Sequence, residues 1–249
     1  LLSKMKKHDF VEIEYTGKLD DGTVFDTTDE ATAKDAGLDS QTAVFGPAVI
    51  CVGENHILPG LEVAFMDKKP GKFDVTLPPD KAFGKKDAKL LKLMPMRAFK
   101  GQDVQPFPGL EVNIDNNFGI VRSVSGGRVI VDFNHPLSSK TLHYDLTVNK
   151  IVTDTLLKAK SLFKNELQIN DDILELNDKV LVIKEDKFPA EVVDAVKKRI
   201  MEIIPEIKDV VLQKEVNSKT VAKESKPKPA VKEPVADAPE NKASAEKKE

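Results

Sequence analysis

Residues 10–26 decide the fold, and they read Phe-Val-Glu-Ile-Glu-Tyr-Thr-Gly-Lys-Leu-Asp-Asp-Gly-Thr-Val-Phe-Asp. Apolar and polar residues alternate through Val11, Ile13 and Tyr15, which is typical of a half-buried strand. Asp20-Asp21-Gly22 then predicts a tight turn, because glycine accepts backbone conformations that strain other residues. A hairpin here brings Tyr15, Phe25 and Asp26 together, so the sequence predicts an aromatic wall that holds one carboxylate.

Three later segments accompany this hairpin in a fixed order. They are Val52-Gly53-Glu54-Asn55-His56-Ile57-Leu58-Pro59-Gly60-Leu61-Glu62, then Leu77-Pro78-Pro79-Asp80-Lys81-Ala82-Phe83-Gly84, and Leu142-His143-Tyr144-Asp145-Leu146-Thr147-Val148. With the hairpin they resemble the FKBP family of peptidyl-prolyl cis/trans isomerases. The shared motifs are Tyr-Thr-Gly, Asp-Gly-x-x-Phe-Asp, Gly-x-x-x-Ile-x-x-Gly-x-Glu and Ala-(Tyr/Phe)-Gly. The resemblance implies an α+β fold, with an antiparallel sheet wrapped on a short helix.

The resemblance also implies a catalytic site, without a cofactor or a metal. Its catalytic residues would be Tyr15, Phe25, Asp26, Leu58, Phe83 and Tyr144, and its substrate-binding residues Ile57 and Leu61. The backbone N–H of Leu58 would bind a substrate carbonyl, and Asp26 would anchor or stabilise the twisted amide without transferring a proton. Taken singly, apolar residues of these types are far more often core residues than site residues. The prediction therefore rests on their joint occurrence in order.

Two positions depart from the animal members of the family. Leu61 stands where they have tryptophan, and Phe83 stands where they have tyrosine. Loss of the indole makes tight binding of the family's macrolide inhibitors doubtful, and loss of the phenol removes one hydrogen bond to substrate. Because the pocket stays apolar, we expect isomerase activity to persist.

The composition excludes several other classes of function. The chain has 249 residues and a net charge of −3, which gives no reason to expect a nucleic-acid partner. No apolar run approaches the length of a membrane span, so no membrane partner is expected. The one cysteine, Cys51, excludes an intrachain disulfide, and the four histidines lack ligand spacing. We expect a cytoplasmic protein.

Residues 86–132 interrupt the family pattern between its first part, 1–85, and its last strand, 133–153. Alternating residues at 110–115, and two apolar runs around Ser125-Gly126-Gly127, predict a small all-β domain. It resembles the insert-in-flap domain of the SlyD-like branch, which implies a chaperone surface for unfolded, proline-containing polypeptides. Flexible apolar side chains suit such binding, and the candidates are Leu93, Met94, Met96 and Phe99. Their alternative role, filling the small core of the insert, is about as well supported.

Residues 154–216 predict an additional α+β domain. Asp154 is placed to cap one helix, Ile173–Leu176 and Val180–Ile183 read as a hairpin, and a second helix starts near Pro189 and carries Val192 on its apolar face. This part resembles the extra domain of the archaeal long-type members. From 217 to 249 the chain is rich in Lys, Glu, Ala and Pro, which is typical of a disordered tail.

The sequence thus favours a prolyl isomerase whose insert captures unfolded chains. Two rivals stay open: a holdase chaperone with a degenerate isomerase pocket, and an adaptor whose C-terminal domain recruits a partner.

Overall fold

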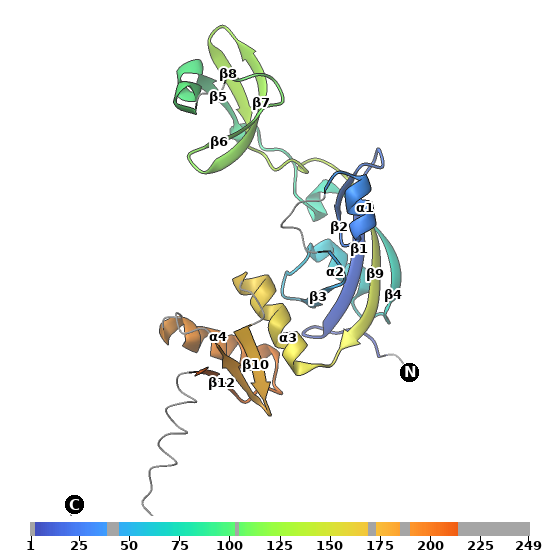
Figure 1. Cartoon of the computed structure of the whole chain (residues 1–249). Helices are drawn as coiled ribbons and strands as arrows, with labels where there is room; N and C mark the ends of the chain where they lie inside the picture. Colours follow the sequence, from blue (N-terminus) through green and yellow to red (C-terminus); the bar gives the residue numbers. More distant parts are fainter. Residues whose placement is uncertain (1–2, 39–44, 103–104, 169–172, 185–189, 214–249) are drawn as a thin grey trace, which may run out of the picture.

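The computed structural model describes residues 3–38, 45–102, 105–168, 173–184 and 190–213. It is an α+β fold with three separate sheets, which confirms the predicted fold class. One sheet lies in the middle of the molecule, the sheet of residues 91–132 lies at one end, and a C-terminal sheet lies at the other (Figure 1). None of the helices in these ranges is long and apolar enough to cross a membrane.

The central sheet is built around β1 (Phe10–Leu19). On one side β1 pairs along its whole length with the antiparallel β9 (Leu142–Val152), and β9 in turn pairs with β4 (Gly71–Leu77). On its other side, β3 (Ala48–Cys51) pairs with the first half of β1 and β2 (Val24–Thr27) with the second half. The predicted last strand is confirmed and continues beyond Val148 to Val152.

The predicted hairpin turn between β1 and β2 is present. Leu19 N–H donates to Thr23 O at 2.9 Å, and Gly22 N–H donates to Leu19 O at 2.9 Å. Gly22 has a φ of 84°, a left-handed conformation that glycine adopts without strain. The short helix α1 (Glu30–Asp35) follows β2, and the Asp29 carboxylate caps it by accepting from Thr32 N–H at 2.7 Å.

Helix α2 (Pro59–Phe65) packs on one face of the central sheet. Phe65 is fully buried against Val11 and Ile13 of β1 and against Leu146 of β9. One turn earlier, Leu61 faces a second cluster, which contains the predicted site residues. The chain then passes through β4 and the 3₁₀ turn η1 (Pro79–Lys81) toward the insert.

The insert forms its own four-stranded sheet in the order β5-β8-β7-β6. The prediction of an all-β domain is wrong in one respect, because the stretch after β5 forms a 3₁₀ helix, η3 (Met96–Gln102), and another 3₁₀ turn, η2 (Ala88–Leu90), precedes β5. The small core gathers around Phe99, Val112, Val121, Val129 and Val131. Its strands are β5 (Leu91–Pro95), β6 (Glu111–Ile114), β7 (Asn117–Ser125) and β8 (Arg128–Asp132).

Two chain segments join the insert to the central sheet, and buried Asp132 fastens them together. Asp132 Oδ2 accepts from Lys86 Nζ at 2.8 Å and from Arg122 Nη2 at 2.9 Å, and Oδ1 accepts from Asn134 Nδ2 at 2.8 Å. The Asn134 side-chain amide also exchanges two hydrogen bonds with the backbone of Asp87, at 2.8 and 3.1 Å. We call these five residues the neck. Burial alone would raise the pKa of Asp132, but its hydrogen bonds outweigh burial and hold that pKa well below its usual range.

The C-terminal domain starts with α3 (Thr155–Leu162), which continues into a π-helical turn, η4 (Phe163–Leu167). The predicted cap is confirmed, since the Asp154 carboxylate accepts from Leu157 N–H at 2.6 Å. The predicted hairpin forms as β10 (Leu174–Asn177) and β11 (Val180–Ile183), and α4 (Ala190–Ile203) crosses over to the parallel strand β12 (Asp209–Leu212). Pro189, the side chain of Val192 and the predicted tail, 217–249, lie outside the described residues.

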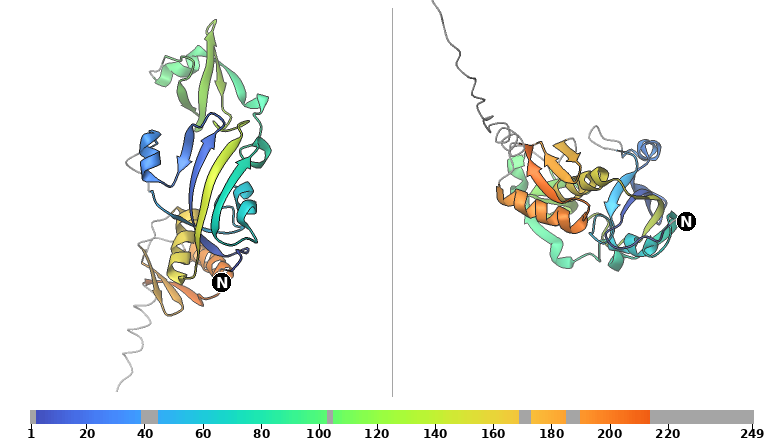
Figure 2. Two further views of the ribbon diagram at one scale, coloured as in Figure 1. Left: turned by 90° about the vertical axis from the view of Figure 1, so that its right-hand side faces the viewer. Right: turned by 90° about the horizontal axis from the view of Figure 1, so that it is seen from below.

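The C-terminal domain shares a core with the central sheet. Phe10 of β1, Cys51 of β3 and Val152 of β9 belong to the same buried cluster as Phe163 and Ile200. In the left view of Figure 2, α3 and α4 lie beside the lower end of the central sheet. The two domains are therefore joined by apolar packing and not only by the chain between β9 and α3.

Candidate active site

The predicted site residues of the central domain come together at one end of its sheet. The cluster is formed by Leu61, Leu77, Leu142 and Tyr144, with Tyr15, Leu19, Phe25, Ile57, Leu58, Val75, Ala82, Phe83 and Leu137 packed against it. We call this set the aromatic cluster. All the predicted catalytic and substrate-binding residues outside the insert belong to it except Asp26, which is bonded to one of its members.

Three rings form the wall of the aromatic cluster. Phe25 meets Tyr144 edge to face, with ring centroids 5.6 Å apart and an interplanar angle of 89°. Tyr15 meets the same Tyr144 at 6.1 Å and 61°. Such edge-to-face contacts favour a fixed arrangement of the rings, so the wall is formed before any substrate arrives.

Gly17 makes this wall possible, and the sequence did not single it out beyond its place in Tyr-Thr-Gly. It pairs with Asp26 across β1–β2 and with Tyr144 across β1–β9. A Cβ atom on Gly17 would lie 2.6 Å from Phe25 Cζ and 2.9 Å from Tyr144 Cε1, far inside van der Waals contact. The two rings therefore rest directly on the backbone of β1.

Asp26 lies at the rim of the aromatic cluster and is exposed, not enclosed in an apolar cleft as the sequence led us to expect. Its Oδ2 accepts a hydrogen bond from the Tyr15 hydroxyl at 3.1 Å. Burial, and then the charge of Asp26, raise the pKa of Tyr15 well above its usual value and that of Tyr144 to about 12. Both phenols therefore stay protonated at neutral pH, and the Tyr15 hydroxyl donates to Asp26.

The threonines after Asp26 hold the backbone of Tyr15 in place. Tyr15 N–H donates to Thr28 Oγ1 at 2.9 Å, and Thr28 N–H donates back to Tyr15 O at 3.0 Å. Thr27 is buried and its hydroxyl lies 2.9 Å from that of Thr16. The sequence analysis missed both residues, because a Thr-Thr pair after a strand has no distinctive pattern.

Ile57 and Leu58 reach the aromatic cluster from the turn before α2. Leu58 caps this helix with its carbonyl, which accepts from Leu61 N–H at 2.8 Å. Within the described residues no hydrogen bond uses the Leu58 N–H, so this donor is available to a bound carbonyl. Leu61 is 3% exposed and lies at the floor of the cluster, where the resemblance places a residue in contact with substrate.

Phe83 reaches the cluster from the loop after η1, and a histidine that the sequence did not point to supports it. His135 stacks on Phe83 with ring centroids 4.1 Å apart and planes only 2° from parallel. Ser138 Oγ also donates to Phe83 O at 3.2 Å, and Ser139 N–H donates to Gly84 O at 2.8 Å. The segment that returns from the insert thus holds the Phe83 loop.

The four predicted binding residues of the insert do not share one environment. Leu93 is 58% exposed, whereas Met94 and Met96 are half-buried against the insert core. Phe99 is 1% exposed and forms part of that core, which is the alternative role that the sequence left open for it. It points inward because η3 turns it onto the buried valines of β7 and β8.

No group of three or more His, Cys, Asp or Glu residues within the described ranges is arranged to hold a metal ion. The aromatic cluster offers an apolar, aromatic surface with the Leu58 N–H as a free backbone donor and the Asp26 carboxylate at its rim.

Comparisons with known proteins agree with this geometry. The family model of FKBP-type peptidyl-prolyl cis-trans isomerase matches residues 3–98, and the model described as FKBP26, IF domain, matches residues 92–137. The short-type peptidyl-prolyl cis-trans isomerase of Methanocaldococcus jannaschii is 28% identical over 61% of this chain and 96% of its own length. The FKBP-type isomerase SlyD of Treponema pallidum is 32% identical over 60% and 80%, and the FKBP-type 16 kDa isomerase of Escherichia coli is 33% identical over 60% and 93%.

The family match and the named relatives define a prolyl isomerase. The chain belongs to the family of FKBP-type peptidyl-prolyl cis-trans isomerases. Both matching family models end before residue 138, so the C-terminal domain lies beyond them.

The stack of His135 on Phe83 gives a first testable prediction. We expect His135→Ala to lower kcat/KM toward a short prolyl peptide by roughly threefold, because an aromatic pair contributes about 0.5–1.5 kcal/mol. His135→Phe keeps the stack and should keep the activity. The matched control is His143→Ala. His143 is a half-buried histidine of β9, and its ring is hydrogen-bonded to Asp20. Equal turnover in His135→Ala and the parent would contradict a supporting role for His135.

Proposed function

We propose that the aromatic cluster is the isomerase site of this protein, and that the insert holds unfolded, proline-containing chains beside it. The observation that carries the proposal is the convergence of four separate segments on one apolar cluster. The hairpin brings Tyr15 and Phe25, the turn before α2 brings Leu58, and the loop after η1 and strand β9 bring Phe83 and Tyr144.

Such a pocket suits the chemistry of prolyl rotation. Rotation about an X–Pro bond crosses a barrier of ~18–20 kcal/mol, because amide resonance is lost in the twisted geometry. No nucleophile is needed, since an enzyme accelerates the rotation by binding the twisted imide better than the planar one. Each ~1.4 kcal/mol of that preference gives a tenfold rate increase. An apolar site favours the twisted imide, which has less charge separation than the planar one.

Each residue then has a definite role in the proposed mechanism. Phe25, Phe83 and Tyr144 line the proline pocket, with Leu61 as its floor. The Leu58 N–H donates to a substrate carbonyl next to the prolyl bond. Asp26, held by the Tyr15 hydroxyl at 3.1 Å, presents a fixed negative charge at the rim. It acts electrostatically on the twisted amide and transfers no proton.

The insert offers an exposed apolar surface for client chains. Leu93 of β5 pairs directly with Ile130 of β8, and both side chains are exposed together with Leu91. Phe118 of β7 is 78% exposed. β5 and β6 are also the edge strands of the sheet, where an extended client could add its own backbone. Exposed apolar side chains on an open sheet are the features that a surface for unfolded chains requires.

The proposal places this activity in the cytoplasm. The fold needs no disulfide, since Cys51 is a free and fully buried thiol. Burial is the main cause that raises the pKa of Cys51 to about 12, so the thiol stays protonated and unreactive.

Removal of the insert tests the two parts of the proposal separately. Residues 88–133 can be replaced by two glycines, because Asp87 and Asn134 are already hydrogen-bonded to each other. We expect turnover of a short prolyl peptide to stay within about twofold of the parent. Catalysis of the proline-limited refolding of a whole protein should fall by roughly tenfold, because the client is no longer held at a high effective concentration near the pocket.

A milder variant, Leu93→Ser with Ile130→Ser, alters the exposed surface and leaves the insert core intact. In this variant too, turnover of the short peptide should stay close to that of the parent, whereas catalysis of whole-protein refolding should fall. Equal losses in both assays would contradict the proposal. The rival holdase has a different signature: the parent would suppress client aggregation without turning over the peptide, and Asp26→Ala with Phe83→Ala would change neither property.

A further inference from the structure

The segment that carries Ile57 and Leu58 into the active site has little backbone support of its own. It runs from Gly53 to Leu58, between β3 and α2. Asn55 in this segment has a φ of 58°, which marks a turn and not a regular element. Among the described residues, no backbone–backbone hydrogen bond uses an N–H of residues 54–58. We call residues 53–58 the carrier segment, and its position must come from side-chain contacts.

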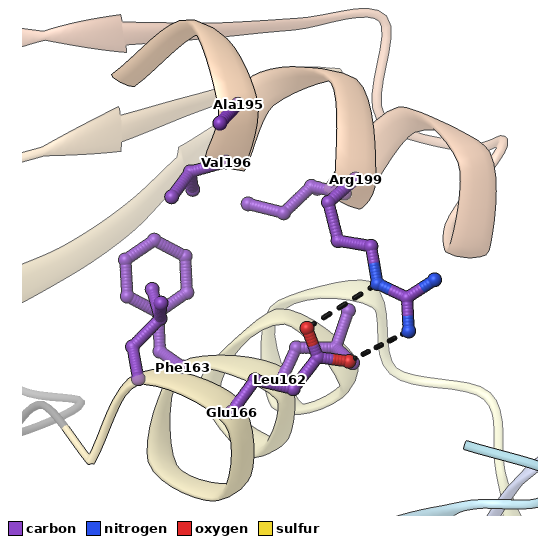
Figure 3. Close-up of a pocket in the computed structure, with 8 residues that line it drawn as sticks. Leu162, Phe163, Glu166, Ala195, Val196 and Arg199 are labelled. Atoms are coloured by element: carbon purple, nitrogen blue, oxygen red, sulfur yellow. Dashed lines mark hydrogen bonds and ion pairs between the residues drawn. The ribbon is translucent and has the colours of Figure 1, made fainter. Parts of the chain in front are cut away.

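The first of these contacts joins Glu54 to the C-terminal domain. Arg199 of α4 donates through Nη2 to Glu54 Oε2. The same guanidinium donates to both carboxylate oxygens of Glu166 in η4, at 2.9 and 3.3 Å (Figure 3). Glu54 is 11% exposed at its side chain, and its other oxygen lies 3.0 Å from His8 Nε2. Burial would raise the pKa of Glu54, but the bond from Arg199 lowers it, so the pair is charged at neutral pH.

The second contact involves His56, two residues before Leu58. Its side chain is 3% exposed. Nδ1 accepts from the backbone N–H of Cys51 at 3.1 Å, so the neutral ring carries its proton on Nε2. Nε2 lies 3.5 Å from Glu166 Oε1, and this carboxylate is also the partner of Arg199. Arg199 is thus hydrogen-bonded to Glu54 of the carrier segment, and Glu166 lies beside His56, whose buried Nε2 has no hydrogen-bond partner among the described residues.

The C-terminal domain is attached at this place by hydrogen bonds and by a shared apolar core, so it can act as a support. Ser161 Oγ and Asn165 Nδ2 both donate to Val49 O of β3, at 2.7 and 2.9 Å. Phe163 and Ile200 pack in one cluster with Phe10 and Cys51. A support made only of exposed ion pairs would be weak. Here the ion pairs lie at the edge of the core that the C-terminal domain shares with the central sheet. The packing of this core holds the ion-paired residues in place.

We propose that Arg199 and Glu166 of the C-terminal domain are positioning residues for the isomerase site. They hold the carrier segment so that Ile57 and the Leu58 N–H face the aromatic cluster. Neither residue touches the substrate. The inference rests on the proposed isomerase site and adds to it a role for a domain that lies beyond the family models.

The test compares two substitutions in the same helix of the full chain. Arg199→Met removes the contacts to Glu54 and Glu166. Lys197→Met, the matched control, removes an ion pair from the same helix to Asp209 of β12, within the C-terminal domain. For Arg199→Met we expect kcat/KM toward a short prolyl peptide to fall by roughly three- to tenfold, because only part of the free energy of the lost charged hydrogen bonds is transmitted to the pocket. Arg199→Lys keeps the charge without the two-pronged bond, so it should recover part of the loss.

Two further measurements separate positioning from simple destabilisation. Combining Glu54→Gln with Arg199→Met should cost no more activity than the larger single effect, because both remove the same contact. Amide hydrogen exchange of Cys51 and Leu61, whose N–H groups bond to His56 Nδ1 and Leu58 O, should become faster in Arg199→Met and stay unchanged in Lys197→Met.

The outcomes of the two proposals can be told apart. An inactive parent would overturn the proposed site, whereas amide exchange would still report on the carrier segment. An active parent with equal turnover and equal exchange in Arg199→Met would overturn the positioning role. Additive losses in the double variant would do so as well, since they would show that Glu54 and Arg199 act independently.

Discussion

Gly17→Ala is expected to lower kcat/KM toward a short prolyl peptide by on the order of 100-fold. The added methyl group would lie 2.6 Å from Phe25 Cζ and 2.9 Å from Tyr144 Cε1, so both rings must leave their positions. A fully buried aromatic side chain contributes about 1.5–3 kcal/mol of apolar contact, and losing this wall removes that contribution from the bound prolyl ring. The measurement is peptide isomerisation, with folding verified by circular dichroism.

Gly71→Ala is the matched control for this prediction. Gly71 also lies in the central sheet, in β4, and a Cβ there meets nothing within 4 Å. Peptide turnover by Gly71→Ala should equal that of the parent. Because Gly17→Ala and Phe25→Ala damage the same wall, their combined effect should be less than the product of the single effects. Near-parental turnover of Gly17→Ala would show that the prolyl ring does not bind between Phe25 and Tyr144.

Asp132→Ala is expected to release the insert from the central domain. The substitution removes the acceptor for Lys86, Arg122 and Asn134 at once, and these bonds meet at a side chain that is only 4% exposed. Losing several charged hydrogen bonds costs about 3 kcal/mol. This corresponds to a roughly 100-fold shift of the equilibrium toward a state in which the two segments of the neck are no longer bonded to each other. We expect faster amide exchange in β5 and β8 and slower catalysis of whole-protein refolding, with unchanged peptide turnover.

The neck should also respond to acid. The pKa of Asp132 is lowered in the folded protein, so its contribution to stability is complete above its unfolded value of about 3.9 and is lost as the pH falls toward the folded value. Amide exchange in the parent insert should therefore rise below about pH 4 beyond the intrinsic change, whereas Asp132→Asn, which cannot titrate, should show no such step. Asp145→Ala, which removes an exposed ion pair to Lys18, is the control. A neck that is equally stable in the parent and in Asp132→Ala would contradict this account.

The sequence predicted the fold well where local signals were strong. The Asp-Asp-Gly turn, the alternation in β1 and the cap at Asp154 each depend on residues close together in the chain, so these elements appear as expected. The ordered motifs also indicated which distant segments meet in the aromatic cluster. Periodicity alone could not have brought Tyr15 and Tyr144 together, because it carries no information about pairing between distant strands.

The misses share a physical cause, which is that side-chain contacts between distant segments leave no local pattern. His135 was one of four histidines without ligand spacing, and only the return from the insert places it on Phe83. Phe99 looked suited to a binding surface, but the 3₁₀ turn rotates it into the insert core. Arg199 is one of several charged residues of α4, and nothing in the sequence distinguishes it from its neighbour Lys198.

The core shared by the central sheet and the C-terminal domain limits how this chain could be shortened. A fragment that stopped at the end of β9 would match the span of its short-type relative more closely, yet it would expose Phe10, Cys51 and Val152 to water. Such a fragment would have a newly exposed apolar surface on the central sheet, the sheet that also carries residues of the proposed active site. A shortened chain would therefore need polar residues in place of these three.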